Sequence, residues 1–82
     1  MDGEIDFSGP VPPWRQLYLI LRADIESGKI PSGRAIPSRR TLHEAYGLAI
    51  PTITKAINEL KADGLIVPVK GMGLFVVDTN ER

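Results

Sequence analysis

Residues 50–62 carry apolar side chains at helical spacing. They are Ile53, Ala56, Ile57 and Leu60, at i, i+3, i+4 and i+7. A rotation of about 100° per residue places Pro51, Lys55 and Asn58 on the opposite face. Thr54 falls at the margin of that face. Since Asn can pair with adenine, Lys with guanine or a phosphate, and Thr with a base or a phosphate, the face has the chemistry to read DNA base pairs.

Two further groups of residues are placed to contact DNA beside this face. Arg39 and Arg40 follow Ser38, a good N-cap, and in the first turn of a helix they would reach phosphates or a base edge. The second group is a glycine-containing turn, which consists of Lys70, Gly71, Met72 and Gly73. The two glycines would let this backbone turn tightly and approach DNA closely.

Two helices are predicted before residue 50. Pro13 suits the first turn of the first helix, and Gly28 ends it. Its apolar face consists of Trp14, Leu17, Tyr18, Leu21 and Ile25. A turn-rich connection follows, with a short strand at 35–36. Ser38 then begins a second helix that ends at Gly47. The inward-facing residues of this second helix are Leu42, Ala45 and Tyr46.

The last part of the domain is predicted to be a β-hairpin. Two β-prone runs, 65–69 and 74–77, flank the turn at 70–73. Pro68 cannot donate to a ladder, so its strand must be an edge there.

Together these elements predict an α+β fold, a winged helix-turn-helix with three helices and a two-stranded wing. Such a fold would insert helix 50–62 in the major groove, with the 70–73 wing on the adjacent backbone or minor groove. We expect a flexible acidic arm at 1–12, the winged-helix domain at 13–77 and a tail at 78–82. Without the turn and the hairpin in this order, the polar face of helix 50–62 would read as a merely solvated side.

Length and charge are compatible with this prediction. The 82 residues suffice for one small domain, and the formal net charge is zero. Residues 1–28 carry two basic and five acidic side chains, whereas residues 29–77 carry seven basic and three acidic ones. In the net charge, the acidic residues before position 29 thus cancel the charge of a basic segment that contains every candidate DNA contact.

Other classes of function find little support in the composition. The chain has no cysteine and one histidine, and it has no cluster of carboxylates at metal or acid-base spacing, so we expect no enzyme, no metal and no cofactor. His43 fits a surface or phosphate-side position better than a ligand role. The acidic first residues and the absence of a long apolar run predict a soluble cytoplasmic protein without membrane contact.

From Pro13 to Val76 the chain resembles the GntR-type winged-helix regulators of bacteria. The residues that carry the resemblance are Gln16, Leu17, Leu21, Ile25 and Gly28 in the first helix; Ile30, Gly33, Ile36, Pro37 and Ser38 in the loop; Arg40, Leu42, Gly47 and Leu48 in the second helix and turn; Thr52, Ile53, Ala56, Leu60, Gly64, Leu65 and Ile66 in the third helix and its exit; and Gly71, Gly73, Phe75 and Val76 in the wing. The resemblance implies a transcription repressor that binds an inverted-repeat operator as a homodimer. It adds Thr52 to the predicted DNA contacts and places a DNA-contacting arginine at Arg40.

The chain departs from the family at the entrance of the recognition helix. Ala49 and Ile50 replace the usual Ser-Arg pair, and Thr54 replaces a second arginine one turn later. Each such contact contributes about 1 to 3 kcal/mol of discrimination, so the operator differs from the usual one or the affinity is lower. Ala49 also lacks a capping side chain, a loss of about 1 kcal/mol, for which Pro51 can compensate in part.

A second hypothesis is a winged helix converted to protein interaction. Its motives are the missing arginines, the apolar Ile50 and Pro51, and the apolar edge at 67–69. The basic and amide residues of the groove face argue against it. Family members normally carry an effector domain, and the sequence identifies no effector ligand. If these residues alone form the dimer, its contacts come from Leu19 and Ile20 or from the acidic arm.

Overall fold

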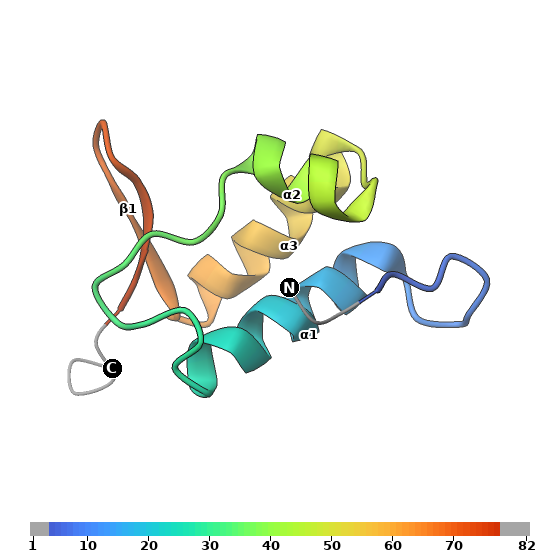
Figure 1. Ribbon diagram of the computed structural model, residues 1–82, viewed down its shortest axis with the longest axis horizontal. Helices are drawn as coiled ribbons and strands as arrows, with labels where there is room; N and C mark the ends of the chain where they lie inside the picture. The colour runs from blue at the N-terminus through green and yellow to red at the C-terminus, as the bar shows by residue number, and fades with distance from the viewer. Residues whose placement is uncertain (1–3, 78–82) are drawn as a thin grey trace.

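Three helices and a two-stranded antiparallel hairpin follow one another in the computed structural model, which describes residues 4–77 (Figure 1). The elements are α1 at Pro13–Glu26, α2 at Arg39–Tyr46, α3 at Ile50–Ala62, β1 at Ile66–Val69 and β2 at Gly73–Val76. The predicted winged helix-turn-helix is therefore confirmed. The first three residues of the predicted arm and the predicted tail at 78–82 lie outside the described residues.

The helix boundaries follow the local chemistry of the chain. Pro13 opens α1. The Ser38 hydroxyl accepts the backbone N–H of Thr41 at 3.1 Å and so caps α2. Gly47 ends α2 with φ of 69°, a conformation that a side chain would strain. Ala49 stands at the N-cap of α3 without a side-chain hydrogen bond, and Pro51 lies in the first turn, as the sequence predicted.

The core forms where α1 and α2 both pack on α3, and the hairpin extends from the far end of α3 (Figure 1). Its fully buried side chains are Leu17, Leu21, Leu42, Ile53, Ile57 and Leu60. All four predicted core residues of α3 are buried, which fixes the rotation of this helix about its axis.

The prediction that Ala45 of α2 faces inward is wrong. Ala45 is exposed, whereas Leu42 and Tyr46 are buried. The described contacts of α2 are mainly with α3, so the short helix buries only the narrow stripe that Leu42 and Tyr46 form at i and i+4. Ala45 lies beside that stripe.

The hairpin gains a third backbone segment. β1 pairs with β2 in the register Ile66↔Val76 to Val69↔Gly73. On the other side of β2, Ala35 forms an isolated bridge with Phe75, where a short strand was predicted. β1 is thus the outer strand, which accommodates Pro68. β1 begins at Ile66, one residue later than predicted, and β2 runs from Gly73 to Val76 instead of over 74–77, so the turn between them is shorter than predicted. Leu65 and Val77 lie just outside the two strands and are joined by a 3.0 Å backbone hydrogen bond.

Gln16 holds the segment before α1 against the helix. Its side chain accepts from the Asp6 backbone N–H and donates to the Asp6 and Val11 carbonyl oxygens, each at 2.7 Å. Ile5 packs against the core from the same segment. The hydrogen bonds of Asp6 with the Ser8 side chain and backbone lower the pKa of the Asp6 carboxyl group. Asp6 and Val11 therefore have defined contacts with α1, and Ile5 has one with the core.

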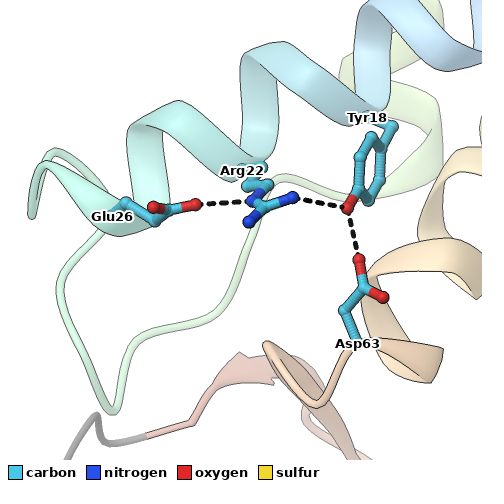
Figure 2. A network of polar contacts seen from close by, with 4 residues as sticks. All are labelled: Tyr18, Arg22, Glu26 and Asp63. Atoms are coloured by element: carbon cyan, nitrogen blue, oxygen red, sulfur yellow. Dashed lines mark hydrogen bonds and ion pairs between the residues drawn. The ribbon is translucent and has the colours of Figure 1, made fainter.

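A polar network ties α1 to the end of α3 (Figure 2). The Tyr18 hydroxyl donates to the Asp63 carboxylate at the C-cap of α3. Arg22 donates to the Tyr18 oxygen at 3.1 Å and to Glu26 at 2.6 Å. The bond to Asp63 favours the neutral phenol, so it raises the pKa of Tyr18. This network fixes the C-terminal end of α3, while the core fixes its middle.

Tyr18→Phe is expected to lower the free energy of unfolding by about 1 kcal/mol, because it leaves Asp63 without this donor and keeps the buried ring. Denaturant unfolding at neutral pH measures the loss. A raised folded-state pKa makes this stabilisation complete below the ordinary tyrosine pKa of about 10 and loses it as pH rises through the folded value. The difference between wild type and variant should therefore shrink above about pH 10. Equal stabilities at pH 7 would contradict the role of the network.

Candidate nucleic-acid interface

The polar face of α3 lies open as the sequence predicted. Pro51, Lys55 and Asn58 are exposed, and Thr54 is half-buried at the margin. Thr52, which only the family resemblance implicated as a DNA contact, is half-buried at the margin of this face opposite to Thr54. The first two turns of α3 thus present side chains outward, which is the part of a recognition helix that contacts base edges.

Arg39 joins α2 to α3 through its guanidinium. Its Nε donates to the Thr54 hydroxyl at 3.1 Å, across 15 residues of sequence. The contact brings an arginine from the first turn of α2 onto the exposed face of α3. The sequence predicted both residues as DNA contacts, but nothing in their spacing indicated that they bind each other.

Arg40 has a different environment from its neighbour. Its Nε lies 3.2 Å from a Glu44 oxygen, and the two side chains are 89% and 64% exposed. Such exposed pairs contribute at most about 1 kcal/mol, so a phosphate can replace Glu44 readily. Arg40 therefore suits contact with the DNA backbone.

Lys55 lies on the exposed face that helix rotation predicted, but its ammonium group is directed toward α1. Its Nζ lies 4.7 Å from the centroid of the Trp14 ring, so the side chain extends toward the start of α1. An exposed cation–π contact contributes about 0.5 to 1 kcal/mol. Trp14 was predicted only as a core residue, yet it is half-buried and also positions this cation. A lone tryptophan at the start of a helix gives no sequence signal for that second role.

The wing stands beside α3 across a small cavity. The cavity, of about 350 Å³, is lined by Ala35, Ile36, Pro37, Ser38, Arg39, Ile57, Met72, Gly73 and Leu74. Lys70, Gly71 and Met72 are exposed at the tip, and Met72 is 67% exposed. Ser38, predicted as a DNA contact, already uses its hydroxyl in the cap and donates to the Thr41 hydroxyl at 3.0 Å. Its structural role is thus established by its own bonds.

His43 closes the turn between α2 and α3. Its Nδ1 lies 2.6 Å from the Leu48 carbonyl oxygen, and since a carbonyl only accepts, Nδ1 carries the proton. The sequence suggested a surface or phosphate-side residue. The ring is exposed, but its bond fixes the chain just before the recognition helix.

Within 4–77, His, Cys, Asp and Glu side chains nowhere gather in threes that could hold a metal ion. None of the helices in this range combines the length and apolar character needed to cross a membrane.

The fold and this face define a winged helix-turn-helix domain. Residues 13–76 match the family described as bacterial regulatory proteins, gntR family, and the chain belongs to that family. Similar relatives include the histidine utilization repressor of Pseudomonas putida, 34% identical over 90% of this chain, and the transcriptional repressor NagR of Bacillus subtilis, 31% identical over 88%. The chain spans 30% of the length of each.

Solved structures agree with this assignment. The AraR DNA-binding domain in complex with its operator ORR3 superposes with a TM-score of 0.77 at 32% identity, over 94% of this chain and 100% of that one. YtrA from Sulfolobus acidocaldarius, a GntR-family transcription factor, gives a TM-score of 0.81 at 30% identity, over 94% of this chain and 65% of that one.

His43→Ala is expected to lower the free energy of unfolding by about 1 kcal/mol, because the turn loses its hydrogen bond to the Leu48 carbonyl. Glu44→Ala is the matched control, since it removes an exposed ion pair from the same helix and should change stability by less than about 0.5 kcal/mol. Thermal and denaturant unfolding measure both. Equal losses in the two variants would show that the turn does not depend on the imidazole.

Proposed function

We propose that this chain is the DNA-reading part of a bacterial transcription regulator, a repressor that binds duplex DNA in the cytoplasm and nucleoid. The observation that carries the proposal is the exposed side of α3, on which Asn58 and the Arg39–Thr54 pair lie. Arg39 also lines the cavity between α3 and the wing. The operator complex of the similar AraR domain supports the same use of this fold. In this proposal α3 enters the major groove and residues 70–73 lie on the adjacent backbone or minor groove.

Base readout and phosphate contact fall to different residues. Asn58 is exposed one turn beyond Thr54, where it reaches a base edge. Lys55 extends toward α1, so its charge meets the backbone beside the groove. Arg40 and Lys70 contribute further phosphate contacts, and Pro51 and Met72 contribute apolar contact. Thr52 contributes a further DNA contact at the edge of this face, Ser38 caps the start of α2, and Gly71 and Gly73 let the wing approach.

Homodimer formation on an inverted repeat completes the proposal. Leu19 is 45% exposed on α1, whereas Ile20 is partly packed into the core. Phe7 and Val11 of the segment before α1 add exposed apolar surface, and Val11 and Leu19 line one shallow pocket. This surface is formed by α1 and the segment before it, from residues other than those of the proposed groove face, so two copies can meet through it.

Selection of bound duplexes from a random pool at about 100 mM salt tests DNA reading. We expect enrichment of an inverted repeat. Asn58→Ala should lose about 1 to 3 kcal/mol of discrimination at one base pair of each half-site, because a base contact is removed. Lys55→Ala should weaken all sequences alike and reduce the salt slope by about one, because a phosphate contact is removed. Absence of enrichment together with negligible salt-dependent binding would favour the protein-interaction alternative at the exposed apolar residues Ile50 and Val67.

Leu19→Asp is expected to abolish cooperative binding to the two half-sites while affinity for a single half-site stays within about twofold. The reason is that a buried charge destabilises an apolar contact between copies but lies away from α3. Titrations of one-site and two-site duplexes measure the two quantities, and sedimentation at high micromolar concentration measures association without DNA. A wild-type chain that binds two-site duplexes without cooperativity would contradict the dimer.

A further inference from the structure

The contact between Arg39 and Thr54 deepens the proposed function, on which this inference rests. We infer that Arg39, from α2, recognises a guanine in the major groove, and that Thr54 does not read DNA but positions the Arg39 guanidinium. Arg39 is then the specificity-determining residue for that base pair.

The atoms used in the contact favour this division of roles. Arg39 donates to Thr54 through Nε, the nitrogen nearest its aliphatic stem. The two terminal Nη nitrogens form the end of the planar fork, and a pair of parallel donors matches the O6 and N7 acceptors of guanine. Thr54 is half-buried as a residue, and its hydroxyl oxygen accepts this bond, so one acceptor site of Thr54 is already used by the arginine. A guanidinium held in this way loses less freedom when it binds a base edge.

The location of the pair also fits the groove and not only the backbone. Thr54 is the fifth residue of α3, in the part of a recognition helix that meets base edges. Arg40 provides the contrast, because it lies at the next position of α2 and its guanidinium turns to Glu44 of its own helix. Two adjacent arginines therefore take separate directions, one onto α3 and one along the surface of α2.

The spacing on α3 predicts the sequence that the pair reads. Asn58 follows Thr54 by four residues, on the same side of the helix and about 6 Å along its axis. Base pairs rise about 3.4 Å, so two contacts separated by this distance along the helix fall no more than about two base pairs apart. We expect a guanine for Arg39 within about two base pairs of the adenine read by Asn58 in each half-site.

Binding to the enriched duplex and to single-base variants of it tests this inference, with Thr54→Val as the main substitution. Valine keeps the shape of threonine and removes the acceptor. Arg39→Ala and Thr54→Val should each reduce discrimination at the same guanine, by about 5- to 150-fold for Arg39→Ala and by less for Thr54→Val. In the Arg39→Ala background, Thr54→Val should have no further effect. Thr54→Ser, which keeps the hydroxyl, should retain discrimination.

Four results would overturn the inference and remain distinguishable from one another. If Thr54→Val and Arg39→Ala change different base pairs and their effects add, Thr54 reads its own base. If Arg39→Ala weakens all duplexes alike, as we expect of the control Arg40→Ala, Arg39 binds a phosphate. If the wild-type chain enriches no sequence at all, the proposed function fails and this inference fails with it. If wild type and Arg39→Ala enrich the same motif, the inference fails but the proposed function stands.

Discussion

The packing of the apolar stripe of α3 against α1 and α2 is the constraint on which the rest of the structure depends. Ile53, Ile57 and Leu60 are fully buried in it. Because a helix has a fixed angle between successive residues, burial of this stripe determines which side chains face outward. The bond between Tyr18 and Asp63 holds the C-terminal end, and the His43 bond holds the turn before the N-terminal end. A recognition face needs this rigidity, since small displacements of a reading side chain lose its hydrogen bonds.

Each of the two helices beside α3 places one side chain against a margin of its exposed side. α2 supplies Arg39 to the Thr54 margin, and α1 supplies Trp14 to the Lys55 margin. Asn58 lies toward the first margin, one turn beyond Thr54. The helix that would enter the groove therefore works with side chains of both supporting helices, and the identity of the base-reading set cannot be separated from how α1 and α2 pack.

This arrangement gives a physical meaning to the missing arginines. Thr54 and Ile50 stand where the resembled family usually carries arginine, which suggests a poorer contact surface when α3 is considered alone. Arg39 brings a guanidinium to the turn of α3 that Thr54 occupies. The zero net charge is equally misleading as a total, because the basic residues gather in 29–77, the segment that contains α2, α3 and the wing. Local placement, not the sum, decides what a phosphate backbone meets.

The sequence by itself determined the order of the elements, the core side of α3 and the turn residues, because helical spacing, Ser38, Gly47 and the glycines of the wing act through local backbone geometry. It failed for Ala45, since the width of a buried stripe depends on how many neighbours a helix has. Only the tertiary structure decided the partners of Arg39, Lys55 and His43. Long polar side chains choose among acceptors that differ little in energy, and the chosen one depends on which element the fold brings near, 15 residues away for Arg39 and on another helix for Lys55.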